Sequence, residues 1–552
     1  MTTPQDDPQA RLRRHVYLLL IVLGTGAMLG RIAAVDAVDR SAIQEQEINS
    51  RVNAHLHAVR PSLEKKLQAE GLGGRQSEEK LKETLEEERA REEARLRSLI
   101  YLRRPFQSAN DRSRWCMVRA LVEPEMRVEG HPYAIDKVVA EPNWDTIDMV
   151  KHDDQGRGGM GPNEGHLYSS KPPLLPTLVA GEYWVIYRLN DVLAKVGLSL
   201  TTDGRPLSLA THAHVVGRFM LVTINLIPLV IGFLLLARLI ERFGTTDWGR
   251  IFTMGAAVFG TFLTTFVVTF NNHLPAAVCG VIALYAAVRI WFDGERRLRY
   301  FIIAGFFGAM MAANELPALA LFAVLSLILL LRAPGRTVLA YLPAAVVVAA
   351  GFFGTNWIAH KSLVPPYMHR SDTDKSDNWY DYTYVRGEGK DAREISSYWN
   401  DPVGVDRGEP CTRTYALHAL VGHHGVFSLT PIWLLSFAGV IVWLCPGRDP
   451  RLRCLALTVA AVTVACFAFY LFLSDQRNYG GVCSGFRWMF WLAPVWLVTM
   501  LPAVDGMARR GWTRCVAAVL LLASIFSASY PTWTPWTNPW LWDWLRYLNV
   551  PV

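Results

Sequence analysis

The sequence predicts an all-α polytopic membrane protein with about eleven transmembrane helices. Of its 552 residues, 51% are hydrophobic and 19 are Trp, and the mean hydropathy is +0.17. The apolar residues are clustered, and stretches such as 215–237, 338–358 and 455–473 carry few or no charges. Each has the length of roughly 20 residues that a helix needs to cross the hydrocarbon core. Because backbone groups in lipid must hydrogen-bond within their own segment, these stretches are expected to be helical.

The first predicted span, 15–35, follows an N-terminal segment, 1–14, in which three of the last four residues are Arg. Positive residues beside an apolar stretch favour the cytoplasmic side, so this span is expected to run from inside to outside. Gly30 and Arg31 do not fit a small-residue cleavage site. The pattern therefore favours an uncleaved signal-anchor helix over a removed signal peptide.

Two long polar segments, 36–173 and 359–425, are then expected as extracytoplasmic loops of a protein integral to the cytoplasmic (inner) membrane. Within the first, 40–104 is rich in Glu, Arg and Lys and carries Leu81, Leu85 and Leu96 on one face. This composition predicts a charged helical insertion, bent at the glycine-rich residues 71–74. A solvated projection and a partner-docking arm both fit it.

The next segment, 174–196, is apolar enough to suggest a span but contains Glu182, Arg188, Asp191 and Lys195. If it crossed the membrane, every later Arg-containing loop would face outward. If it lies in the interface, all of those loops become cytoplasmic, as the positive-inside rule requires. The sequence therefore predicts an amphipathic juxtamembrane helix on the outer side.

The positive-inside rule also divides 300–332 into two short helices that turn at 314–317, because one long helix would place the Arg residues that follow it on the outer side. The spans then form a bundle at 213–358 and a distal group at 426–530, followed by a Trp-rich extracytoplasmic tail at 531–552 that includes Trp533. In order, the predicted spans are 15–35, 213–237, 250–270, 274–292, 300–315, 317–332, 338–358, 426–445, 452–473, 486–504 and 512–530.

The charge of the chain bears on its possible partners, and the cysteine content bears on possible disulfides. The net charge of +7 could indicate nucleic-acid binding, but no basic face with interleaved aromatic residues is present, and many Arg lie in short loops between spans. No nucleic-acid partner is therefore expected. Cys116, Cys411 and Cys483 would face an oxidising compartment, where one disulfide among them is conceivable but cannot be deduced.

Four outer patches combine polar and aromatic residues beside the membrane. They are Asn110–Trp115, Gly165–Pro173, Asn271–His273 and Asn478–Trp488. Each has a simple structural explanation: Asp111 can cap a helix, Lys171 can reach lipid phosphates, and Arg487 can anchor a helix end.

Taken together, a short apolar anchor, an outer loop with Asp-x-x-Arg-aromatic at 111–115 and Tyr-Ser-Ser-Lys-Pro-Pro-Leu-Leu at 168–175 ahead of many spans resemble the GT-C class of membrane glycosyltransferases. Within that class, the pattern is most similar to the family of lipid A aminoarabinose transferases and protein O-mannosyltransferases. The resemblance covers about 105–360, with 105–173 as a catalytic-type loop and 40–104 as an insertion. It implies a GT-C-like architecture.

The resemblance also implies a reaction. Such enzymes move a sugar from a polyprenyl-phosphate-linked donor to a lipid, glycan or protein acceptor at the outer leaflet, in contact with membrane lipids. By similarity, Asp111 is the catalytic base and Lys171 pairs with the carrier phosphate. Arg487 and Arg114 are further candidates for the phosphate. The candidates for the sugar or acceptor site are His166, Tyr168, His273 and Glu315.

The chain departs from the family pattern at Asn110-Asp111, where relatives often carry two adjacent acids. A second carboxylate from Asp145, Asp148, Asp153 or Asp154 is an alternative, so a divalent metal stays open although no metal ligand is assigned.

Two other classes of function fit parts of the sequence. A transporter or flippase of a lipid or small solute would show symmetry-related broken helices and charges at mid-membrane depth. No such symmetry is visible, and apart from Glu315 the polar residues gather in the outer loops. A scaffolding protein would use 40–104 to dock a cell-envelope partner.

Overall fold

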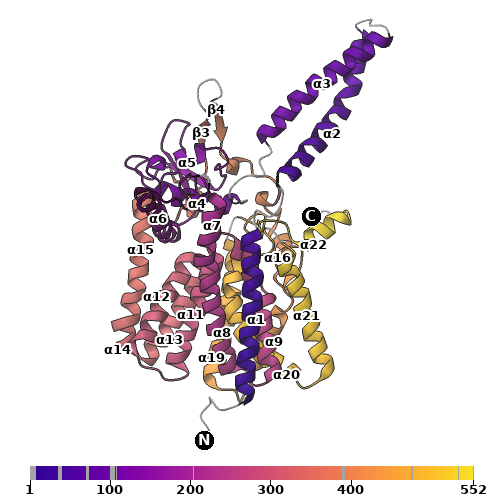
Figure 1. Ribbon diagram of the computed structural model, residues 1–552. Helices are drawn as coiled ribbons and strands as arrows, with labels where there is room; N and C mark the ends of the chain where they lie inside the picture. The colour runs from indigo at the N-terminus through magenta and orange to yellow at the C-terminus, as the bar shows by residue number, and fades with distance from the viewer. Residues whose placement is uncertain are drawn as a thin grey trace.

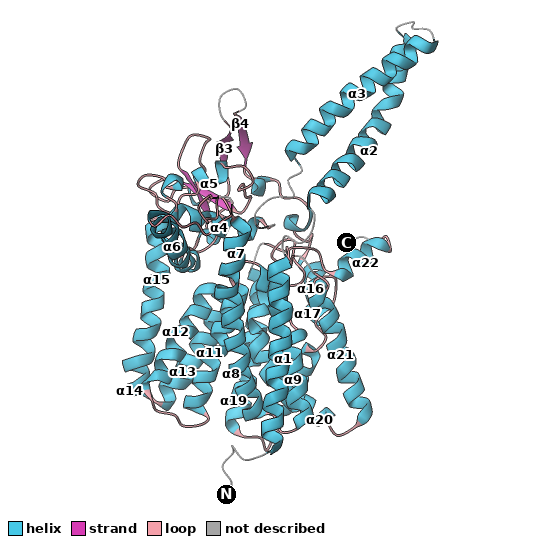
Figure 2. Cartoon of the chain, viewed as in Figure 1, coloured by secondary structure: helices cyan, strands magenta, loops and turns pink. Residues whose placement is uncertain are grey.

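The computed structural model describes residues 8–34, 40–69, 74–99, 106, 108–202, 204–387, 392–473, 476–531 and 534–550. These residues are mostly helical, and Figure 1 shows a bundle of long helices with one elaborated end. At that end lie short helices, loops and two small β-hairpins, and we call it the loop end. Figure 2 shows that the drawn strands are confined to it. The predicted class, a helical polytopic membrane protein, is confirmed.

In the described part of the chain, eight helical stretches are long and apolar enough to cross a membrane. They are Pro8–Ala33, Ala213–Phe243, Asp247–Val268, His273–Trp291, Pro334–His360, Pro450–Phe472, Arg487–Met507 and Gly511–Ser529. Three shorter apolar helices are Leu298–Asn314, Leu316–Arg332 and Trp433–Leu444. Each of the eleven predicted spans overlaps one of these helices. The number of crossings stays a prediction, because three of the helices are short.

The elements of the bundle are bounded as follows. They are α1 (Pro8–Ala33), α7 (Ala213–Leu221), α8 (Ile227–Phe243), α9 (Asp247–Phe259), α10 (Phe262–Thr265), α11 (His273–Trp291), α12 (Leu298–Asn314), α13 (Leu319–Arg332), α14 (Pro334–Arg336), α15 (Leu342–His360), α18 (Trp433–Leu444), α19 (Pro450–Ala468), α20 (Ala493–Met507) and α21 (Gly511–Ser529).

The elements of the loop end include six helices and four strands. They are α4 (Ala109–Val122), α5 (Asp136–Ala140), α6 (Leu174–Lys195), α16 (Thr412–Leu420), α17 (Val426–Leu429) and α22 (Trp540–Tyr547), with β1 (Met149–His152), β2 (His166–Ser169), β3 (Thr383–Arg386) and β4 (Arg393–Ser396). Strands β1 and β2 pair antiparallel, with Met149 opposite Ser169, and β3 pairs in the same way with β4.

Helix α6 covers the segment for which a juxtamembrane helix is predicted. It is not among the stretches that qualify as spans, and Figure 1 shows it nearly end-on while the bundle helices run up the page. Its buried residues are Leu174, Pro176, Val179, Ala180 and Tyr183. This three-to-four-residue spacing gives one apolar side that packs against the protein.

Within 40–104, α2 (Arg40–Ala69) and α3 (Gly74–Leu99) form a helical hairpin, which points away from the bundle in Figure 1. Its small apolar cluster of Ile48, Val52 and Leu96, with Leu56 packed against it, is separate from the main core. The bend predicted at 71–74 falls largely outside the described residues.

The structure also describes the cysteines and part of the Trp-rich tail. Cys116, Cys411 and Cys483 are all free thiols, so the disulfide considered among them is not formed. In the Trp-rich tail, Trp536 and Trp540 pack against a buried cluster that contains Phe262 and Phe266. Trp533 lies outside the described residues.

Candidate active site at the loop end

Asp111 lies in the first turn of α4 and is almost fully buried. Ser108, and not Asp111, caps this helix, because its side chain accepts a hydrogen bond from the backbone N of Asn110. Asp111 Oδ1 instead accepts from the backbone N of Phe270 at 3.0 Å. Burial raises the pKa of Asp111 to about 7, although the Phe270 N–H and the charge of Arg114 act in the opposite direction. This carboxyl group can therefore exchange a proton near neutral pH.

Lys171 lies two residues after β2 and pairs with Asp148. Its Nζ is 2.8 Å from Asp148 Oδ1, which also accepts from Ser170 Oγ at 2.9 Å. Burial lowers the pKa of Lys171 to about 8, helped by the positive charges of Arg114 and Arg487 and opposed by Asp148. Burial would raise the pKa of Asp148, but Lys171 holds that pKa below its ordinary value. The pair is ionised and held in place.

Helix α4 and the β1–β2 hairpin are joined through hydroxyl groups. Ser113 Oγ donates to the backbone O of Asp148 at 2.6 Å and lies 2.6 Å from Ser169 Oγ. Ser169 Oγ in turn accepts from the backbone N of Lys171 at 3.2 Å. These bonds fix Lys171 relative to α4, and so relative to Asp111 and Arg114.

A chain of side-chain contacts links Arg114 to Arg487. Arg114 Nη2 donates to Asn272 Oδ1 at 2.6 Å, and Asn272 Nδ2 donates to Glu315 Oε1 at 2.8 Å. The same Glu315 oxygen contacts His273 Nδ1, and Arg487 Nη1 lies 3.0 Å from His273 Nε2. Since a guanidinium only donates, His273 Nε2 accepts this hydrogen bond. The ring proton is then on Nδ1, which donates a hydrogen bond to Glu315. The four elements that meet are α4, the start of α11, the α12–α13 turn and the 3₁₀ turn Arg487–Leu492.

Arg114, Lys171 and Arg487 form what we call the cation cluster. All three are largely buried, and the charges of the two Arg lower the pKa of Lys171. Burial, and then the charge of Arg487, lowers the pKa of Arg114 to about 10. Arg487 is held by a bond from Nε to the backbone O of Gly480, whose φ of +93° suits glycine, and by the Trp536 ring 4.9 Å from its Cζ. Gathering three buried cations is costly, so this arrangement suits an anionic ligand.

His166 and Tyr168 do not join this cluster through any contact described for them. Tyr168 stacks on His152, with ring centroids 4.2 Å apart, and its hydroxyl lies 3.2 Å from His131 Nδ1. Side chains alternate along a strand, so these two residues of β2 point away from the face on which Ser169 meets α4. The other predicted site residues, Asp111, His273 and Glu315, do lie with the cation cluster.

Of the four alternative acids, only Asp148 joins the cluster. Asp145 lies 3.5 Å from Arg386, Asp153 accepts from the backbone of its own turn, and Asp154 lies 3.3 Å from His131. Sequence reasoning missed that Asp148 is the partner of Lys171 and that Asn272 bridges Arg114 to Glu315. The polar run Asn271-Asn272-His273 next to a span was the available signal for Asn272.

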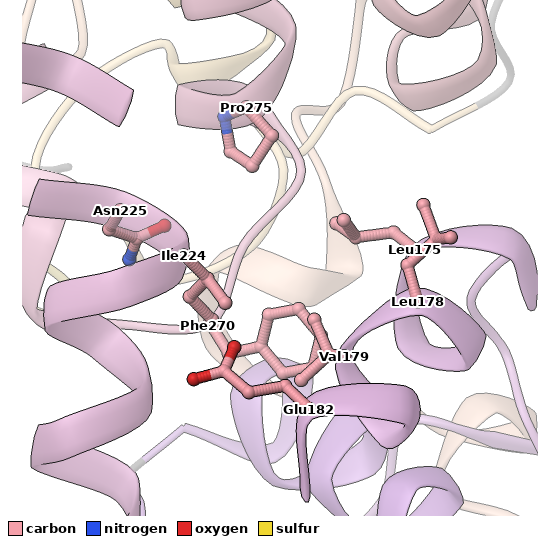
Figure 3. Close-up of a pocket in the computed structure, with 8 residues that line it drawn as sticks. All are labelled: Leu175, Leu178, Val179, Glu182, Ile224, Asn225, Phe270 and Pro275. Atoms are coloured by element: carbon pink, nitrogen blue, oxygen red, sulfur yellow. The ribbon is translucent and has the colours of Figure 1, made fainter. Parts of the chain in front are cut away.

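A pocket of about 210 Å³ lies between α6, the π-helical turn Val222–Leu226, Phe270 and the start of α11 (Figure 3). Phe270 forms one wall, and its backbone N is the donor to Asp111. Asn225 Nδ2 donates to the backbone O of Val267 and of Thr269, which holds this segment in place. The lining residues are mainly apolar: Leu175, Leu178, Val179, Glu182, Ile224, Asn225, Phe270 and Pro275.

No family model and no curated protein matches the chain. Among solved structures, the oligosaccharyltransferase of Archaeoglobus fulgidus in complex with Zn and sulfate is 15% identical with a TM-score of 0.34, over 81% of this chain and 56% of that chain. Its apo form is 14% identical with a TM-score of 0.34, over 80% and 58% of the two chains. The archaeal oligosaccharyltransferase AglB from the same organism, in complex with an inhibitory peptide and a dolichol-phosphate, is 13% identical with a TM-score of 0.33, over 80% and 58%. The chain thus spans less than two thirds of the length of these remote structural relatives.

Proposed function

We propose that this protein is a membrane glycosyltransferase that moves a sugar from a polyprenyl-phosphate donor to an acceptor hydroxyl at the extracytoplasmic leaflet. The observation that carries the proposal is the burial of Arg114, Lys171 and Arg487 together beside Asp111, at one end of a membrane-helix bundle. The phosphate groups of membrane lipids lie at the level where a membrane-spanning bundle leaves the hydrocarbon core. A lipid phosphate is therefore an anion that this end of the bundle would meet.

The cation cluster would bind the phosphate and stabilise the charge that develops on it as the sugar departs. Lys171 would act as a point charge, and the two guanidinium groups can each donate two bonds to phosphate oxygens. Asp148 favours the ionised form of Lys171 and positions it before the donor arrives, and the Glu315–His273 pair positions Arg487. Preorganised cations of this kind contribute to rate because they need little rearrangement during the reaction.

Asp111 would accept the proton of the acceptor hydroxyl. The oxygen then forms a bond to the anomeric carbon, the bond from that carbon to the phosphate oxygen breaks, and the carrier phosphate leaves as an anion. A base works best when its pKa is close to the ambient pH, and the pKa of Asp111 is raised to about 7. The apolar pocket next to Phe270 would take an apolar portion of a bound lipid.

The test is transfer by purified protein reconstituted in lipid, with a panel of polyprenyl-phosphate sugars. Wild-type protein should consume one donor and label an acceptor. Asp111→Asn should reduce transfer by about 100-fold or more, which is the usual contribution of a general base, and Lys171→Ala should do so through loss of the phosphate contact.

Matched controls are Lys195→Ala and Asp191→Asn, which change exposed residues at the far end of α6 and should leave transfer unchanged. If Asp111→Asn and Lys171→Ala transferred sugar as fast as wild type, the assigned roles would be wrong. If the protein instead exchanged a labelled solute across the membrane and formed no covalent product, a transporter would be the better description.

A further inference from the structure

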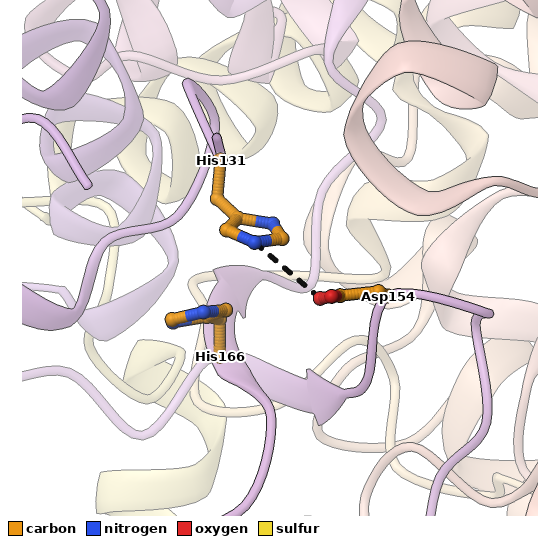
Figure 4. A group of neighbouring side chains, drawn as sticks. All are labelled: His131, Asp154 and His166. Carbon is orange, nitrogen blue, oxygen red and sulfur yellow. Dashed lines mark ion pairs between the residues drawn. The ribbon is translucent and has the colours of Figure 1, made fainter. Parts of the chain in front are cut away.

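Three side chains that the proposed transfer does not use meet at the β1–β2 hairpin (Figure 4). His131 comes from the segment before α5, Asp154 from the connection between β1 and β2, and His166 from the first position of β2. Each offers one ligand atom, and these three atoms lie within 4.8 Å of one another. Two imidazoles and a carboxylate are a ligand set typical of zinc and related ions.

The spacing is close to that of a metal centre. His131 Nε2 lies 3.3 Å from Asp154 Oδ1, and the rings of His131 and His166 are 4.2 Å apart at their centroids. In a tetrahedral zinc site with bonds of about 2.0–2.1 Å, neighbouring ligand atoms are about 3.3 Å apart. The His131–Asp154 pair already has this separation, and small side-chain rotations would bring His166 to it.

Residues around the group orient these ligands. The hydroxyl of Tyr168 lies 3.2 Å from His131 Nδ1, which leaves Nε2 for an ion. Asp136 Oδ2 lies 3.5 Å from His166 Nδ1, and Asp136 Oδ1 accepts from the backbone N of Leu167. A His166 ring that pairs with Asp136 through Nδ1 likewise leaves Nε2 free. Metal-binding histidines usually have such a partner on their second nitrogen.

The turn that carries Asp154 is also fixed. The neighbouring Asp153 accepts from the backbone N of Gln155 and of Arg157, each at 2.9 Å, and pairs with the Arg157 side chain. Asp154 itself is exposed, with 75% of its side chain accessible, so an ion from solvent can reach the group. The group therefore combines ordered ligands with an open entry.

We infer that His131, Asp154 and His166 form a binding site for a divalent transition-metal ion of the zinc class. Three protein ligands leave a fourth position for water. The bound ion would join three separate segments around β2, the strand that leads directly into Lys171. It would thus stabilise the part of the loop end that positions Lys171, without itself contacting the reacting groups.

The test uses full-length protein in detergent, treated with a chelator and then titrated with Zn²⁺ by calorimetry. We expect one site in the wild type. Asp154→Asn should weaken binding by at least tenfold and should not affect folding, because this side chain is exposed. Tyr168→Phe should also weaken binding, by about 10–100-fold, because it removes the partner of a metal-binding histidine.

The matched control is His57→Ala, an exposed histidine on the hairpin arm, which should bind Zn²⁺ as wild type does. A second control addresses another histidine group of the loop end, His418, His423 and His424. The inference is overturned if wild-type protein binds no Zn²⁺, or if Asp154→Asn binds it normally while His423→Ala does not. Because the readout is binding, its result is independent of whether the protein transfers sugar.

Discussion

At the scale of single residues, burial brings the pKa values of an acid and a base close together. The pKa of Asp111 is raised to about 7, and the pKa of Lys171 is lowered to about 8, mainly because each side chain is removed from water. In the proposed reaction Asp111 must be ionised to accept a proton, and Lys171 must be protonated to hold a phosphate. Both conditions are met together only in a narrow pH range.

The pH dependence of kcat/KM should therefore be bell-shaped, because this parameter reports groups of the free enzyme. As pH rises through about 7, Asp111 ionises and transfer should increase. As pH rises further through about 8, Lys171 loses its proton and transfer should decrease. Lys171→Arg should remove the alkaline limb, since a guanidinium stays charged. An alkaline limb that persists unchanged in this variant would assign it to another group.

At the scale of secondary-structure elements, a buried ion pair at the C-terminal end of α4 is linked to α6 through Tyr183. Arg119 Nε donates to Glu123 Oε2 at 2.8 Å, and both side chains are fully buried. Tyr183 of α6 donates its hydroxyl to Glu123 Oε1 at 2.7 Å and accepts from the backbone N of Leu209. The helix that carries Asp111 and Arg114 is thereby held against α6.

Glu123→Ala should lower stability by about 1–3 kcal/mol, because it leaves the buried Tyr183 hydroxyl without its acceptor and removes one of the two carboxylates that pair with Arg119, the other being Glu141. Thermal unfolding of the purified protein should show a clear drop in Tm. The control is Glu64→Ala, which breaks the exposed pair with Arg60 in α2 and should change stability by less than about 1 kcal/mol. Equal Tm values for the two variants would show that the buried pair does not fasten α4.

Local patterns in the sequence predicted the helical class, because a membrane-spanning helix can be recognised from a continuous run of apolar residues. They also singled out the polar and aromatic patches that contain Asp111, Arg114, Lys171 and Arg487, whose roles were then assigned by resemblance. The bonds among these residues could not be predicted, since Arg114 and Asn272 are 158 positions apart in the sequence and meet only through packing. His166 and Tyr168 were grouped with Lys171 by proximity in the sequence, but the alternation of β2 separates them from it.

At the scale of the whole molecule, the hairpin α2–α3 is an independent unit. Its apolar cluster does not join the main core, and it extends away from the bundle in Figure 1. An arm of this kind contributes little to the stability of the bundle, whether it is a solvated projection or a docking surface.

Replacing residues 40–99 by a short Gly/Ser linker should therefore leave the Tm of the purified protein and the transfer of sugar close to those of wild type. The matched comparison is an equally long replacement of 109–168, which removes α4, β1 and three of the four residues of β2 and should abolish transfer. If loss of the arm abolished all function while the bundle stayed folded, the scaffolding hypothesis would be favoured over catalysis in the bundle.

The whole molecule also has two ends, which the proposed topology assigns to opposite sides of the membrane. Cys411 is exposed at the start of α16, at the loop end, and Cys445 is exposed just after α18. The start of α19, a few residues after Cys445, contacts the turn after α11, because Arg451 Nη1 donates to the backbone O of Phe292. Arg448, Arg451 and Arg453 on one side of this contact and Arg296 and Arg297 on the other are the reason that the proposed topology assigns this end to the cytoplasm.

In intact cells, a membrane-impermeant maleimide should therefore modify a variant that retains only Cys411 and should not modify one that retains only Cys445. Permeabilised cells should show modification of both, which controls for the reactivity of each thiol. Labelling of Cys445 from outside would invert the topology. It would also place Asp111 and the cation cluster in the cytoplasm, where the lipid-linked donor would have to be bound from the inner leaflet.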